Sequence, residues 1–73
     1  MDSFRIRSYS KAELAMCYFP TTPNPHTAVN HLMSWIKRCT PLYDSLVKHG
    51  YTKTSKWFSP RQVRLIVEYL GEP

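Results

Sequence analysis

The chain has 73 residues, of which ten are Lys or Arg and five are Asp or Glu, so its formal net charge at neutral pH is +5. This length suits one small domain, near the lower size limit for a core that folds without a disulfide or a metal. A hydrophobic fraction of 42% argues against a disordered segment, so we expect a single folded domain over residues 1–73. No apolar run approaches the roughly 20 residues of a membrane-spanning helix, and we expect no membrane association.

The N-terminus and the cysteine content indicate a reducing compartment. No charged segment runs into an apolar stretch, so no secretory signal is expected. The two cysteines, Cys17 and Cys39, are therefore predicted to be free, buried thiols of a cytoplasmic protein. The excess of positive charge attracts polyanions, which include nucleic acid, anionic membranes and acidic proteins.

The first predicted element is a short, half-exposed strand in residues 4–9, "FRIRSY", where apolar and polar side chains alternate. A short helix follows over residues 11–18. Ser10 and Glu13 have the spacing of a capping box, in which each side chain accepts a hydrogen bond from the other residue's backbone N–H. Tyr9 is expected to pack over Leu14 as a hydrophobic staple.

The longest predicted helix runs from residue 25 to about residue 39, after a proline-rich loop, "PTTPNP". Asn24 is its expected N-cap, with Pro25 at the first helical position. At 100° per residue, the broad apolar side consists of Ala28, Val29, Leu32, Met33, Trp35, Ile36 and Cys39. Opposite it lies a polar stripe of Thr27, Asn30, His31, Ser34 and Arg38, with Lys37 at its margin. Trp35 is thus expected to pack in the core.

A third helix is predicted over residues 41–49, with Thr40 as its N-cap and Pro41 at the first helical position. Its inward-facing residues are Leu42, Leu46 and Val47, and Gly50 follows as a left-handed C-cap.

Residues 51–58, "YTKTSKWF", have aromatic ends around a polar middle and predict a hairpin with its tip at residues 53–56. The last helix then extends from Pro60 to Gly71. Ser59 and Gln62 form a second capping box, and Phe58 is expected to pack over Val63. The repeated aromatic-Ser-x-x-Glu/Gln pattern therefore predicts two strand-to-helix junctions, with residues 4–8 and 56–58 paired in one antiparallel sheet. The predicted fold class is mainly α with a small antiparallel β-sheet (α+β).

The order of a capped "YSKAELA" helix, an amphipathic "LMSWIKR" helix, a hairpin and "FSPRQVRLIVEYL" resembles the winged helix-turn-helix domains of mercury-resistance-type (MerR) regulators and phage excisionases. That resemblance implies DNA binding through the second helix and the wing. The chain departs from the pattern in its longer, proline-rich turn and in its additional helix at residues 41–49. The segments "SKAELAMCYFP", "WIKR", "GY" and "IVEYLGEP" also look like a family of short bacterial proteins with no established activity.

The polar stripe supplies candidate base-reading residues, because Asn pairs with adenine and Arg with guanine in the major groove. The alternative is an ordinary solvated helix face. Candidate phosphate contacts are the basic residues of the first strand, the second helix, the hairpin tip and the last helix, namely Arg5, Arg7, Lys37, Lys53, Lys56, Arg61 and Arg64. Their alternative role is solubilising charge.

Two functions follow from these patterns. The first is a small DNA-binding protein of regulatory or mobile-element accessory type, with double-stranded DNA as its partner. The second is an interaction module that docks an acidic protein, or a protein with a complementary apolar patch, without touching DNA. The scattered acids and the absence of a Gly-rich phosphate loop argue against an enzyme, and we expect no cofactor. The spacing of Cys17, His26, His31 and Cys39 matches no common zinc site, so we expect no metal.

Overall fold

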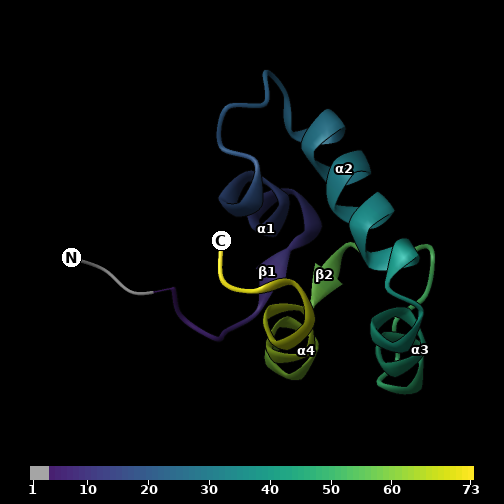
Figure 1. Ribbon diagram of the computed structural model, residues 1–73. Helices are drawn as coiled ribbons and strands as arrows, with labels where there is room; N and C mark the ends of the chain where they lie inside the picture. Colours follow the sequence, from purple (N-terminus) through teal and green to yellow (C-terminus); the bar gives the residue numbers. More distant parts are fainter. Residues whose placement is uncertain (1–3) are drawn as a thin grey trace.

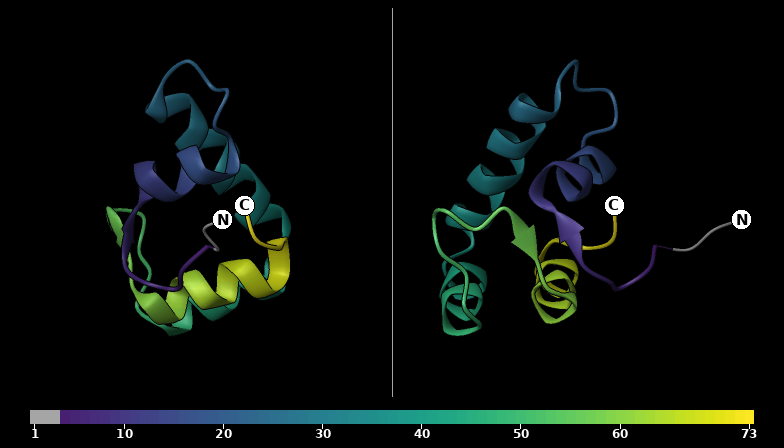
Figure 2. Two further views of the ribbon diagram at one scale, coloured as in Figure 1. Left: turned by 90° about the vertical axis from the view of Figure 1, so that its left-hand side faces the viewer. Right: turned by 180° about the vertical axis from the view of Figure 1, so that it is seen from behind.

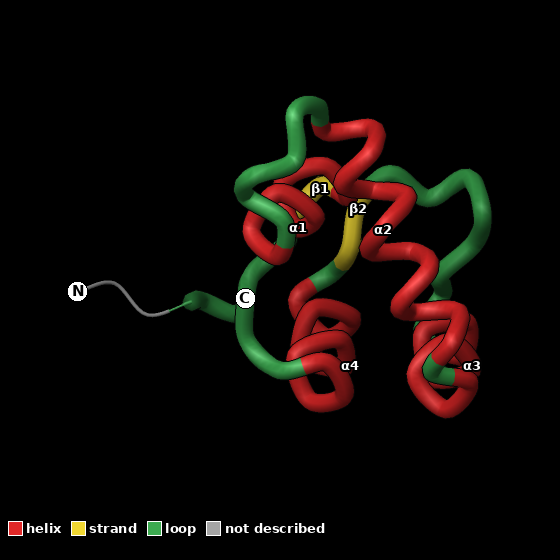
Figure 3. Tube along the Cα trace, turned by 45° about the horizontal axis from the view of Figure 1, so that its top comes forward, coloured by secondary structure: helices red, strands yellow, loops and turns green. Residues whose placement is uncertain are grey.

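The computed structural model describes residues 4–73, which form helices around one pair of short strands in a body of 30 × 26 × 19 Å. In chain order the elements are β1 (Tyr9–Ser10), α1 (Lys11–Tyr18), α2 (Pro25–Arg38), α3 (Thr40–Lys48), β2 (Trp57–Phe58) and α4 (Pro60–Leu70). Helix α1 packs against α2, α3 lies beside α4, and the strands lie between the two helix pairs (Figure 1). The predicted fold class, mainly α with a small antiparallel sheet, is confirmed (Figure 3).

One apolar core joins all of these elements. Phe58 of β2 is the largest of the side chains that have no exposed surface. Fully buried residues from the four helices surround it, namely Leu14, Ala15, Ala28, Leu32, Ile36, Leu42, Leu46, Val63 and Ile66. Every helix contributes buried residues to this cluster, so the loss of any one helix would expose the core to solvent.

Both predicted capping boxes are confirmed. At the start of α1, the Ser10 hydroxyl accepts from the Glu13 backbone N–H and the Glu13 carboxylate accepts from the Ser10 N–H, both at 3.1 Å. At the start of α4, Ser59 and Gln62 make the same two bonds at 3.2 and 2.9 Å. A short helix has few other ways to satisfy its first N–H groups, so these bonds define where α1 and α4 begin.

The strand pair is shorter than predicted and lies closer to the helix starts. Tyr9 is opposite Phe58 and Ser10 is opposite Trp57 in an antiparallel register. The prediction of a strand over residues 4–8 was wrong. This segment folds back onto Tyr9, whose ring stacks on Phe4 at 5.3 Å and whose hydroxyl donates to a backbone carbonyl within the segment at 2.9 Å. These contacts draw residues 4–8 away from β2.

The predicted hairpin over residues 51–58 does not form. The Thr52 N–H donates to the Ser55 hydroxyl and the Ser55 N–H donates to the Thr52 carbonyl, both at 3.1 Å, which closes a local turn. The aromatic ends meet through ring stacking, with Tyr51 and Phe58 at 5.8 Å between centroids. Only the end of the segment becomes a strand, and it pairs with β1. Residues 51–56 are therefore a loop between α3 and β2.

Several smaller predictions, about side-chain burial and about one helix cap, were wrong. Trp35 is 42% exposed and Val47 is 49% exposed, although both were expected in the core. Cys17 is exposed, while Cys39 is half-buried, and both thiols are free. Helix α3 begins at Thr40 itself and has no side-chain cap, so Thr40 is not its N-cap. The apolar surface of each of these helices is wider than the area that the neighbouring elements cover.

Candidate functional site

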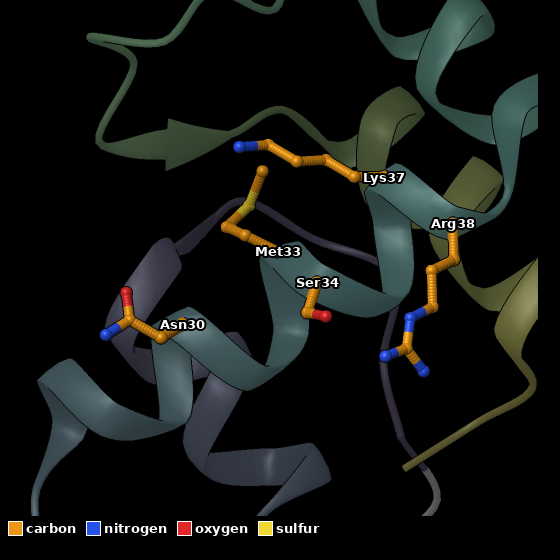
Figure 4. Close-up of a pocket in the computed structure, with 5 residues that line it drawn as sticks. All are labelled: Asn30, Met33, Ser34, Lys37 and Arg38. Carbon is orange, nitrogen blue, oxygen red and sulfur yellow. The ribbon is translucent and has the colours of Figure 1, made fainter.

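Helix α2 presents an open polar face. Its buried residues are Ala28, Leu32 and Ile36, so the opposite side of its four turns faces solvent. Along this face Asn30, Met33, Ser34, Lys37 and Arg38 line a hollow of about 420 Å³ (Figure 4). The hollow contains three of the five predicted base-reading residues and, within the described part of the chain, no acidic side chain.

The predicted polar stripe is not uniform. In Figure 4, Lys37 extends alongside Met33, whereas Arg38 points to the other side of the helix. The His31 ring lies 5.4 Å from the Phe19 ring, beyond the hollow. Thr27 is half-buried in the first turn of α2, where its backbone N–H is bonded to the N-cap Asn24 at 2.8 Å. Asn30 and Ser34 are thus the central polar residues of this face.

Beside this face lies a second cavity of about 310 Å³, which we name the lysine groove. It is lined by Lys11, Val29, Asn30, Met33, Lys37, Tyr43, Tyr51 and Lys53. Lys11 begins α1, Lys37 lies near the end of α2, and Lys53 comes from the loop between α3 and β2. Three elements distant in sequence therefore bring one positive charge each to a groove that no acidic residue among residues 4–73 lines.

The lysine groove has an ordered floor. Tyr51 is 4% exposed, and its backbone N–H donates to the Leu46 carbonyl at 2.9 Å. Its hydroxyl contacts the Met33 sulfur at 3.6 Å, and the Lys11 ammonium lies 4.8 Å from the centre of its ring. A cation over an aromatic face is electrostatically favoured, so Tyr51 holds the Lys11 charge at the groove. Lys11 was not among the predicted site residues.

The predicted phosphate contacts fall into two groups. Lys37 and Lys53 share the lysine groove. Lys56 lies in an adjoining hollow that also includes Lys11. Figure 2 shows that the loop carrying residues 53–56 and the N-terminal segment lie on opposite flanks of the molecule.

The second group lies along the N-terminal segment and α4. Arg61 and Arg64 line a separate hollow with Ile6. The Arg7 guanidinium lies 3.8 Å from the centre of the Tyr9 ring, and Arg5 precedes it in the same segment. The predicted phosphate-contacting residues therefore do not form a single basic rim. Only the first group adjoins the polar face of α2.

The chemistry available at the groove is the binding of anions. Its polar groups are ammonium, amide and phenol groups, which suit hydrogen bonding to a phosphate oxygen. Within residues 4–73, no three His, Cys, Asp or Glu side chains lie close enough together to hold a metal ion.

Comparison with known proteins identifies the family. A family model described as "Domain of unknown function (DUF4248)" matches residues 5–73. The chain belongs to the DUF4248 family. The match spans every element of the fold, including both capping boxes and all of the groove lysines, so the site described above lies inside the DUF4248 domain. The searches of curated proteins and of solved structures gave no match. No helix in the described part of the chain is both long and apolar enough to cross a membrane.

Proposed function

We propose that the protein is a non-catalytic DNA-binding protein that contacts duplex DNA through the polar face of α2 and the lysine groove. The observation that carries this proposal is the convergence of Lys11, Lys37 and Lys53 beside Asn30 and Ser34, in a lining to which residues 4–73 contribute no acid. Positive charge gathered from separate elements is what a phosphate backbone requires, and exposed Asn and Ser side chains on one helix face suit base edges.

Contacts to phosphate and contacts to bases have different roles in this proposal. Lys11, Lys37 and Lys53 bind phosphate oxygens and position the protein without reading sequence. Asn30 reads a base edge, and Ser34 contacts either a base or a phosphate. Arg38 extends from the same helix on the far side of the hollow and serves as a second base-reading residue.

The resemblance to winged helix-turn-helix domains of MerR-type regulators and excisionases supports a regulatory or mobile-element accessory role. In this proposal the turn at residues 51–56 takes the place of the hairpin wing, because it carries Lys53 and Lys56 next to α2. The expected setting is the bacterial cytoplasm, where DNA is present and thiols such as Cys17 and Cys39 stay reduced.

The test is a fluorescence-anisotropy titration of the protein against a random duplex pool at two salt concentrations. The wild type should bind more tightly at low salt. Lys53→Ala should flatten the log–log salt dependence of the affinity by about one unit, since one phosphate contact is lost. Asn30→Ala should relax the preference among sequences, by about 1–3 kcal/mol at the base pair it reads, while sparing non-specific binding.

Arg64→Ala is the matched control. It removes the same unit of charge from an exposed position, but from the hollow near Ile6 and away from the lysine groove. The salt slope should be unchanged in this variant. Equal losses from Lys53→Ala and Arg64→Ala would show that only net charge matters and would contradict an interface on α2. A wild type without salt-sensitive binding at low ionic strength would reject DNA binding altogether.

A second candidate function is the docking of a protein partner, and one surface favours it. Trp35 and Tyr69 are 42% and 47% exposed, and they line a shallow hollow together with Arg38, Cys39 and Leu70. An exposed aromatic surface of this kind suits an acidic partner, or one with a complementary apolar patch. A partner protein that binds the Lys53→Ala variant but does not bind the Trp35→Ala variant would favour docking over DNA binding.

A further inference from the structure

Trp57 is the most exposed large hydrophobic side chain in residues 4–73, with 61% of its surface accessible. Strand geometry explains its direction. Successive side chains of a strand point to opposite faces, so the full burial of Phe58 turns Trp57 outward. Its cross-strand partner is Ser10, whose side chain is too small to cover an indole ring. The fold therefore holds a large flat aromatic surface in solvent.

Two lysines accompany this indole. Trp57 lines a hollow of about 370 Å³ together with Ser10, Lys11, Ala12, Val29 and Lys56. The Lys11 N–H donates to the Lys56 carbonyl at 2.9 Å, which fixes the backbones of both lysines at the end of the strand pair. The remaining members of the hollow are small or apolar, so the lysines are its charged groups.

The Trp57 hollow adjoins the lysine groove, because Lys11 and Val29 line both. A single surface therefore runs from Trp57 past Lys56 and Lys11 to Lys37 and Lys53. The nearest acid on α1 is Glu13, whose carboxylate is bonded to the Ser10 N–H in the capping box. The surface combines an exposed aromatic ring at one end with cations along its length.

An exposed aromatic ring beside cations is a combination that suits an unpaired nucleotide. The base stacks on the ring and the flanking phosphates contact the lysines, whereas a base inside a duplex already has both of its faces stacked. Any of the four bases stacks in this way, so such a subsite requires no sequence.

We infer that Trp57, Lys56 and Lys11 form a subsite for an unpaired nucleotide, so that the protein prefers duplex DNA that continues into a single strand. The duplex part of this inference rests on the proposed function, with the duplex on the polar face of α2 and the single strand leaving over Trp57. The subsite itself rests on the exposed indole and its two lysines.

The experiment compares three fluorescein-labelled DNAs by anisotropy at one salt concentration. They are a blunt duplex, the same duplex with a short single-stranded thymidine extension on one strand or the other, and the single-stranded extension alone. The wild type should bind the extended duplex about tenfold more tightly than the blunt one, a modest value for the stacking of one base on an aromatic ring. Trp57→Leu should remove this preference and leave the affinity for the blunt duplex unchanged. Trp57→Phe should retain part of it.

Trp35→Leu is the matched control, because it removes the other exposed indole from a different surface. Its preference for the extended duplex should equal that of the wild type. In Trp35→Phe, Trp57 is the only remaining tryptophan, and its fluorescence should be quenched when the extension binds. Thermal melting by circular dichroism checks that each variant is folded.

The outcomes separate this inference from the proposed function. Equal wild-type affinity for blunt and extended duplexes, or a preference that survives Trp57→Leu, overturns the subsite and leaves duplex binding intact. Binding of the extension but not of the blunt duplex, lost in Trp57→Leu, supports the subsite and rejects the proposed duplex interface. Failure to bind any of the three DNAs rejects both.

Discussion

The two strand-to-helix junctions begin with the same short pattern but differ in their surroundings. At the β1–α1 junction, Glu13 closes the capping box from an exposed position, and its carboxylate makes no other hydrogen bond within residues 4–73. At the β2–α4 junction, Gln62 closes the capping box while 6% exposed. Its amide also donates to the His49 carbonyl at 2.9 Å, which joins the start of α4 to the end of α3.

This difference explains the choice of residue at each position. A carboxylate is favourable at an exposed helix N-terminus, where it faces the positive end of the helix dipole. A carboxylate in the place of Gln62 would be buried and would set one of its oxygens against the His49 carbonyl, with no N–H to donate. The same local pattern therefore serves as a surface cap in one copy and as an interior connection in the other.

The largest expected effect comes from giving each of these two positions the residue of the other, in two single variants. Gln62→Glu should lower the free energy of unfolding by about 3 kcal/mol, because it buries a charge and leaves the His49 carbonyl without its donor. Glu13→Gln should cost only about 0.5 kcal/mol, since the amide oxygen still accepts from Ser10 and only the charge is lost. Urea denaturation of both variants measures the asymmetry.

Acidic pH sharpens this test. Burial raises the pKa of the introduced carboxyl above the ordinary value of about 4.3, so in the folded state it is protonated first as pH falls and regains a donor for the His49 carbonyl, and the recovery is complete below about pH 4.3. The deficit of Gln62→Glu relative to the wild type should therefore shrink by most of its value as pH falls, whereas Glu13→Gln has only about 0.5 kcal/mol to regain. Equal costs for the two exchanges at neutral pH would mean that the buried connection to α3 contributes nothing.

The next largest effect is the loss of each N-cap hydroxyl. Ser59→Ala and Ser10→Ala should each cost about 1 kcal/mol, the usual cost of an N-cap side chain. Ser59→Ala should cost somewhat more, because the Gln62 N–H loses its bond to the Ser59 hydroxyl, and this bond helps to keep the Gln62 amide on the His49 carbonyl. Thermal unfolding of the two variants side by side gives both numbers. Unchanged midpoints in both would contradict the role of the capping boxes in fixing α1 and α4.

The capping boxes and helices were predictable because their signals are local. A cap depends on residues three positions apart, and helix amphipathicity depends on a few turns of one element. The burial of Gln62 was not predictable in this way, since its partner His49 follows another helix, α3. Trp35 was misplaced for a related reason. Its apolar character is evident in the sequence, but the extent of cover from the eight-residue helix α1 is not.

The candidate site was predictable only in part. The polar face of α2 followed from helical periodicity, which placed Asn30 and Ser34 correctly on its exposed side. The lysine groove did not, because it requires the start of α1 to meet Tyr51 in a loop far along the chain. The signal that was available is the position of Lys11 immediately after a capping Ser at a predicted strand end, where its N–H donates to the Lys56 carbonyl just before β2.

The smallest expected effect concerns the other ends of the same two helices. The Tyr18 hydroxyl at the end of α1 donates to the Gly71 carbonyl, just after α4, at 2.5 Å. Tyr18→Phe removes this bond and should cost about 0.5 kcal/mol, because the freed carbonyl is exposed and water replaces the hydroxyl. Tyr69→Phe, on an exposed tyrosine of α4, is the matched control and should cost less.

High pH gives this last prediction a distinct signature. Burial, followed by the nearby Cys17 and Glu72 charges, raises the pKa of Tyr18 from 10.0 to about 12. Below pH 10 Tyr18 is protonated in both the folded and unfolded states, so its contribution to stability is fully present. Between pH 10 and 12 the unfolded state loses this proton first, and the free energy of unfolding falls. The stability difference between the wild type and Tyr18→Phe should therefore shrink across this range, as followed by urea denaturation at several pH values. A difference that stays constant from pH 9 to 12 would show that the hydroxyl titrates alike in both states and that its burial does not raise its pKa.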